Sequence, residues 1–277
     1  MKALWNLYTF EIKQNFRSFL IWFGLIAILL FLLMLMFPTF KSSDYLEVIN
    51  AKINAIPKGL GTAFGLDSSV AGVNFQNIVF WFGYSTQFFV IAIIIYAINL
   101  GSSIVSKENE EKHIDYLATK PINKSSIIFA KYKVLVSYIL LFSVALFVVG
   151  CISIMIFNVD QTPFFKEILR LFVKVFFEYL FFGTLAFAIA AASRRTTKSS
   201  LVVVAIFFGS YILGIVSQLQ DNLHKLQYLS PYIMFQTDKA GYSFSHTDYW
   251  YMAVLLGLSI AMFGIALWRY TTKDLSL

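Results

Sequence analysis

Residues 107–133, KENEEKHIDYLATKPINKSSIIFAKYK, form a short charged segment between two long uncharged runs. Upstream, residues 68–106 contain no Asp, Glu, Lys or Arg, and downstream, residues 134–159 contain none either. The uncharged runs are long enough to cross a membrane, so they decide the fold. A polar segment between two such spans allows a cytoplasmic partner to transmit force to the membrane helices. This segment is therefore the best indication of function.

Composition places the chain among the polytopic membrane proteins. Of its 277 residues, 58% are hydrophobic and only 13% are charged, whereas soluble domains carry about 25% charged residues. A water-soluble fold cannot bury this much apolar surface. The apolar runs are continuous rather than alternating with polar residues, which excludes a membrane β-barrel.

Six apolar stretches predict an all-α fold with six transmembrane helices. They cover residues 19–37, 78–100, 134–157, 169–192, 201–216 and 251–268. Before the first span, Met1, Trp5, Tyr8 and Ile12 recur at helical spacing. This spacing favours an amphipathic helix over residues 1–16 that lies in the membrane interface. The alternative is a cytoplasmic extension of the first span.

Lys and Arg in the loops predict the orientation of the chain. The loops on one side carry 14 of them: Lys2, Lys13, Arg17, Lys107, Lys112, Lys120, Lys124, Lys131, Lys133, Arg194, Arg195, Lys198, Arg269 and Lys273. The loops on the other side carry five: Lys41, Lys52, Lys58, Lys225 and Lys239. The positive-inside rule therefore places both termini and the charged segment in the cytoplasm. It also accounts for the net charge of +7 without a nucleic-acid partner. On the outer side, residues 217–250 are rich in Tyr and Phe and are expected to dip into the membrane interface.

The charged segment is predicted to contain a short helix, a break and the start of a second helix. Acids crowd its start and suit a helix dipole: Glu108, Glu110 and Glu111. Ile114 and Leu117 give the short helix one small apolar face, and Pro121 ends it. Asn123 is expected to cap a second helix that runs through Lys131 into the third span. The alternative is a solvated loop that only keeps two spans apart.

The stretch EEKHIDYLATKPINKSSIIFAK resembles the hallmark of the type-two ABC transporter permeases, the ABC-2-like exporters. The matching positions are Glu110, Glu111, Lys112, His113, Ile114, Asp115, Tyr116, Leu117, Pro121, Ile122, Asn123, Lys124 and Lys131. His113 stands where Thr is usual, and Lys124 stands where Arg is usual. SRRTTKSS after the fourth span and YLSPYIMF before the sixth are also similar to that family, so the resemblance covers essentially the whole chain.

This resemblance implies that the charged segment is a coupling helix, which rests in a groove of a separate ATP-hydrolysing subunit and passes its motion to the spans. The residues expected to contact that subunit are Glu108, Glu110, Glu111, His113, Ile114, Tyr116, Leu117 and Pro121. The chain would then be a single permease domain, residues 1–277, with an interfacial helix at 1–16, a coupling segment at 107–125 and an outer loop at 217–250.

The resemblance further implies an ATP-driven exporter in a bacterial plasma membrane. Two ATPase subunits would work with this chain and with a second permease, which is either another copy or a paralogue. The expected cargo is amphipathic or hydrophobic, such as an antimicrobial peptide, an antibiotic or a lipid-like molecule. The competing hypothesis is a non-transporting scaffold or sensory subunit that binds a cytoplasmic partner through residues 107–125.

The chain itself is not expected to be an enzyme. It contains no G-x-x-x-x-G-K-[ST] motif, so ATP and Mg²⁺ are expected in the partner subunit, and this chain is expected to bind no cofactor. Its three histidines, His113, His224 and His246, lie in predicted loops, and neither H-E-x-x-H nor C-x-x-C occurs. No metal site is therefore predicted.

The fourth span begins with an unusual row of charges. Lys166, Arg170, Lys174 and Glu178 follow one another at steps of four residues. A charge inside a membrane costs about 2.5–3.5 kcal/mol on insertion scales, so Lys174 and Glu178 should face each other, protein or water. They predict a polar lining at the outer part of a substrate path. The alternative is a span that starts later, with these residues in water.

Overall fold

The computed structural model describes residues 2–41, 75–110, 123–158, 162–193, 199–219, 221–234 and 246–272. All regular secondary structure within these ranges is helical, as predicted. The elements are α1 (Lys2–Leu35), α2 (Phe37–Phe40), α5 (Ile78–Glu110), α7 (Lys124–Phe157), α8 (Phe165–Ala192), α9 (Ser199–Leu219), the 3₁₀ helix η2 (Asp221–Leu229), α10 (Pro231–Met234) and α11 (His246–Thr272).

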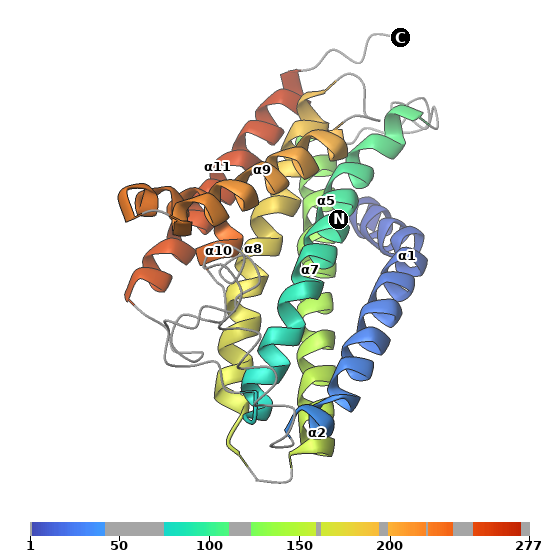
Figure 1. The fold of residues 1–277 in the computed structure, drawn as a ribbon. Helices are drawn as coiled ribbons and strands as arrows, with labels where there is room; N and C mark the ends of the chain where they lie inside the picture. The colour runs from blue at the N-terminus through green and yellow to red at the C-terminus, as the bar shows by residue number, and fades with distance from the viewer. Residues whose placement is uncertain are drawn as a thin grey trace.

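Six of the described helices are long and apolar enough to cross a membrane, so the predicted number of spans is confirmed within these ranges. They are Leu4–Thr39, Ile78–Ser106, Lys124–Phe157, Phe165–Ala192, Ser199–Ser217 and His246–Thr272. Each includes one predicted span, and five of the six begin earlier than hydropathy alone indicates. Figure 1 shows the long helices packed side by side, with the C-terminal ends of α5, α8 and α11 at one end of the bundle.

The first helix is longer than the predicted first span. α1 is continuous from Lys2 to Leu35, so residues 2–16 belong to the same helix as that span. Figure 1 shows its N-terminal turns lying across the longer part, which runs along the bundle. The helix ends close to residue 37, the predicted end of the first span, because α1 stops at Leu35 and Pro38 lies in the first turn of the short helix α2.

The centre of the bundle is formed by α5 and α8. Within one apolar stretch of 18 consecutive residues in each span, 67% of the residues are buried in α8 and 61% in α5, against 22% in α1 and α9. The two helices approach closely because glycines meet where they cross. A Cβ atom at Gly101 would overlap the carbonyl oxygen of Gly183. Small residues of this kind let membrane helices pack backbone to backbone.

Part of the predicted outer loop packs against the helices of the bundle. The hydroxyl of Tyr232, in α10, donates a hydrogen bond of 3.1 Å to the carbonyl oxygen of Gln87, well inside α5. The ring of Tyr232 also packs edge-on against Tyr211 of α9. Ser230 and Tyr232 are buried, whereas Tyr228 and Leu229 are more than half exposed, so the segment 221–234 reaches the packed core at the start of α10.

Candidate functional site

The two helices that flank the charged segment are well defined. α5 continues through Glu110, and α7 begins at Lys124. The prediction that a helix runs from here through Lys131 into the third span is therefore confirmed. Asn123 occupies the N-cap position with an extended backbone, but its side chain makes no capping hydrogen bond. Its carbonyl oxygen accepts one from the amide of Ser126 at 2.9 Å instead.

Most of the predicted coupling residues lie outside the part of the chain that the structure describes. Glu108 and Glu110 belong to the last turn of α5, where only the backbone is described. The remaining six fall between the described ranges: Glu111, His113, Ile114, Tyr116, Leu117 and Pro121. What the structure adds is the arrangement of the helices on either side of them.

A buried ion pair joins three helices close to the stretch between α5 and α7. Nζ of Lys131, on α7, donates one hydrogen bond of 2.7 Å to Oε1 of Glu11 on α1 and another of 2.6 Å to the carbonyl oxygen of Ile104 on α5. The Lys131 side chain is 0% exposed and that of Glu11 is 8% exposed. We call Glu11, Ile104 and Lys131 the Lys131 cluster. Lys131 therefore lies inside the bundle and not in a loop, although removing it from the count leaves the charge asymmetry in place.

Further hydrogen bonds hold α1 against α7 beside the Lys131 cluster. The hydroxyl of Tyr8 shares a hydrogen bond of 2.9 Å with Oγ of Ser137, and the hydroxyl of Tyr138 donates to the carbonyl oxygen of Ile12. Tyr8 and Ile12 belong to the apolar stripe of the predicted interfacial helix. Both pack against the protein core, while Trp5 is 65% exposed.

Sequence reasoning did not identify Glu11. It is the only acidic residue before Asp44, and it lies among residues predicted to form an interfacial helix. Lys131 was singled out as a family position but was counted as a surface charge. The sequence showed a single acidic residue among basic ones in this predicted helix, but this pattern does not indicate which residue pairs with it.

A second ion pair lies within the membrane-spanning region, between α8 and α11. Nζ of Lys174 lies 2.9 Å from Oδ2 of Asp248, and both side chains are about nine-tenths buried. The expected pairing of Lys174 with Glu178 on one helix face is thus replaced by a bridge between helices. Asp248 was missed because α11 begins at His246, five residues before the predicted span.

Glu178 lies one helical turn beyond Lys174 and is 1% exposed. Its Oε1 has no hydrogen-bond partner among the described residues, and neither has the hydroxyl of the adjacent Tyr179. Nearby on α11, the hydroxyl of Tyr251 donates to the carbonyl oxygen of Tyr228 at 3.0 Å. Burial of Lys174 and Glu178 by protein excludes the alternative in which water surrounds them. Among the described residues, no group of three His, Cys, Asp or Glu could hold a metal ion.

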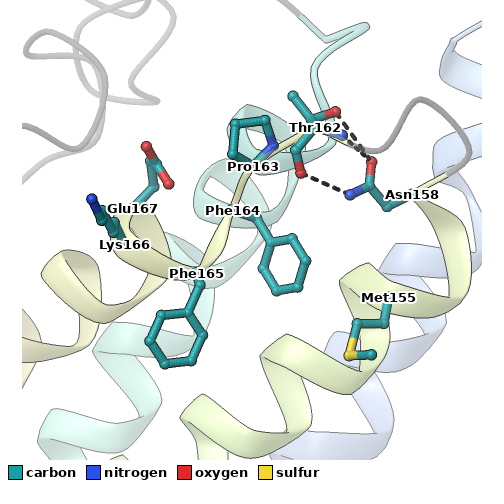
Figure 2. A pocket seen from close by; sticks show the side chains of 8 residues that line it. All are labelled: Met155, Asn158, Thr162, Pro163, Phe164, Phe165, Lys166 and Glu167. Atoms are coloured by element: carbon teal, nitrogen blue, oxygen red, sulfur yellow. Dashed lines mark hydrogen bonds between the residues drawn. The ribbon is translucent and has the colours of Figure 1, made fainter.

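An open pocket of about 650 Å³ lies where α7 ends and α8 begins (Figure 2). The side chain of Asn158 closes this connection, since Nδ2 donates to the carbonyl oxygen of Thr162 at 2.8 Å and Oδ1 accepts from the Thr162 amide at 3.0 Å. Lys166 and Glu167 line the pocket, whereas Lys174 and Glu178 do not. The pocket is therefore separate from the buried charges of α8.

Comparison with known families gives a match over nearly the whole chain. The model of a family described as "ABC-2 family transporter protein" matches residues 5–275. No curated protein matches the chain significantly. The family match includes the charged segment, both flanking helices and the residues of both buried ion pairs.

Proposed function

The chain belongs to the ABC-2 family of transporter proteins, and from this premise we propose that it exports an amphipathic or hydrophobic cargo across a bacterial plasma membrane. It is the membrane permease component of an ABC-2 type transporter and is not a catalytic subunit. Permeases of this family work with ABC ATPase subunits, and the ATP and Mg²⁺ belong to those subunits. The observation that carries the proposal is the family match over residues 5–275, with the charged segment between two long helices.

We infer that residues 107–125 receive the force from the ATPase. Any displacement of this segment acts on the end of α5 and on the start of α7, because the segment is covalently joined to both. Both helices continue without interruption from this end of the bundle through the membrane. The apolar face of Ile114 and Leu117 would seat in the ATPase, and Glu108, Glu110, Glu111, His113, Tyr116 and Pro121 would complete the contact.

Transport would proceed by alternating access in a pair of permeases. Two ATPase subunits would close on ATP, and the spans of this chain and of a second permease would open outward. Both termini would lie in the cytoplasm, as the Lys and Arg distribution favours. We propose a peptide, an antibiotic or a lipid-like molecule as cargo, with the buried charges at Lys174 and Glu178 near its path.

Replacement of Leu117 by Asp tests this function directly. A charge on the apolar face should prevent the short helix from seating in the ATPase, while insertion of the spans stays unchanged. In vesicles that contain the permease and its ATPase, we expect the Leu117→Asp variant to lose stimulation of ATP turnover by cargo. The matched Leu117→Ile variant keeps an apolar side chain and should retain it. Equal stimulation in both variants would contradict the coupling role, and no stimulation in the wild type would favour the scaffold hypothesis.

A further inference from the structure

We propose that the Lys131 cluster fastens the N-terminal turns of α1 to both helices that flank the coupling segment, so that these three parts move as one body. This inference rests on the proposed function, because it concerns how motion spreads from the segment 107–125. Glu11 and Lys131 are positioning residues in it, and neither is assigned to contact with cargo or with the ATPase.

The position of the cluster is the first argument. Ile104 lies six residues before the end of α5 at Glu110, and Lys131 lies seven residues after the start of α7 at Lys124. One ammonium group therefore links the two helices close to the segment between them. The same group binds Glu11, so α1 is held at the level where motion would enter the bundle.

The chemistry of the cluster is the second argument. A buried ion pair is weak evidence for stability, because the loss of hydration offsets most of the attraction between the charges. What such a pair supplies is a fixed geometry, since charge-assisted hydrogen bonds are short and directional. Oε2 of Glu11 has no hydrogen-bond partner among the described residues. The buried carboxylate therefore depends on Lys131, and α1 has one favourable position against α7.

The surrounding contacts support a rigid connection. Lys131 and Tyr138 are seven residues apart on α7 and share one face of that helix. Both reach α1, one at the Glu11 carboxylate and the other at the Ile12 carbonyl. Two points of attachment on one face resist both sliding and rotation of α1 relative to α7. α1 would then follow α7 when the segment is displaced.

Hydrogen exchange measured by mass spectrometry can test this connection in the assembled transporter. The permease and its ATPase would be compared without nucleotide and with ATP and vanadate, and exchange would be followed in residues 2–18 and 100–110. In the wild type we expect nucleotide to change exchange in both regions. In the Glu11→Met/Lys131→Met variant, we expect the change to remain in residues 100–110 and to be lost in residues 2–18. In Glu11→Gln, whose amide oxygen can still accept a hydrogen bond from Lys131 but carries no charge, we expect the change in residues 2–18 to be reduced.

The variants are chosen to separate transmission from folding. Glu11→Gln keeps the size and polarity of the side chain, and the double variant replaces the whole ion pair by apolar groups without leaving a buried charge. Lys133→Met is the matched control, because Lys133 is exposed on the same helix two residues away. It should behave as the wild type does.

Each outcome decides a different question. A nucleotide response in residues 2–18 that persists in both cluster variants would overturn the inference. A wild type that responds in residues 100–110 but not in residues 2–18 would also overturn it while leaving the proposed function intact. A wild type that responds in neither region would contradict the proposed function itself.

Discussion

Lys131 illustrates how a charged side chain can be part of the interior of a membrane protein. Its ammonium group has both a carboxylate and a carbonyl oxygen as acceptors and has no exposed surface. Removal of one member of such a pair leaves the other charged and buried, which costs about 3–5 kcal/mol. Replacement of both members by apolar groups is often neutral.

We therefore predict that Lys131→Met lowers the stability of the purified permease by about 3–5 kcal/mol, seen as a lower midpoint of thermal unfolding in detergent. The Glu11→Met/Lys131→Met variant should recover most of this loss, because no charge is left without a partner. Lys133→Met serves as the control and should unfold with the wild type. If Lys131→Met unfolded with the control instead, the buried ion pair could not be present in the folded protein.

The bridge between Lys174 and Asp248 makes a second prediction at this scale. Lys174→Ala and Asp248→Ala should each destabilise the fold, and the double variant should lose less than the sum of the two. We expect a coupling free energy of about 0.5–3 kcal/mol from thermal unfolding of the four proteins. The parallel cycle with Lys174→Ala and Glu178→Ala should give the smaller coupling. A larger coupling for Lys174 with Glu178 would restore the pairing inferred from sequence spacing.

At the scale of the helices, the close crossing of α5 and α8 depends on glycine. We predict that Gly101→Ala destabilises the protein by about 1–3 kcal/mol, because the added methyl group overlaps the backbone at Gly183. Gly209→Ala on α9 is the control, since a Cβ atom there meets nothing within 4 Å. Thermal unfolding in detergent distinguishes the two, and a Gly101→Ala protein as stable as Gly209→Ala would show that the helices can separate at little cost.

How much of each helix could be predicted depended on what its ends contact. Hydropathy identified the apolar middle of all six spans, because lipid and core both require apolar side chains there. It placed Asp248 in a loop, because an unpaired charge is unfavourable in a span and the sequence did not reveal its partner, Lys174. It distinguished residues 1–16 from the first span because apolar residues there recur at helical spacing among polar ones. The pattern could not show the contact of Glu11 with Lys131, which lies 120 residues away on α7. The short helix within residues 107–122 rests on sequence alone.

At the scale of the whole molecule, the distribution of Lys and Arg predicts which end of the bundle faces the cytoplasm. We expect single cysteines placed at Ser125 and Pro163 to lie on opposite sides of the membrane. Cys151 is the only native cysteine, so a Cys151→Ser background allows this test. A membrane-impermeant maleimide applied to intact cells should label position 163 and should label position 125 only after lysis. The reverse pattern would invert the orientation and place the charged segment outside.

Cross-linking from position 117 tests most directly whether an ATPase subunit binds the segment between α5 and α7. A photoreactive amino acid at position 117 should give, on illumination of the assembled transporter, a covalent product that contains the ATPase subunit. The same amino acid at Pro163, near the opposite end of α7 and α8, should give none. The account predicts the product at position 117 alone. An intact transporter that forms no such product at position 117, or forms it equally from position 163, would contradict it.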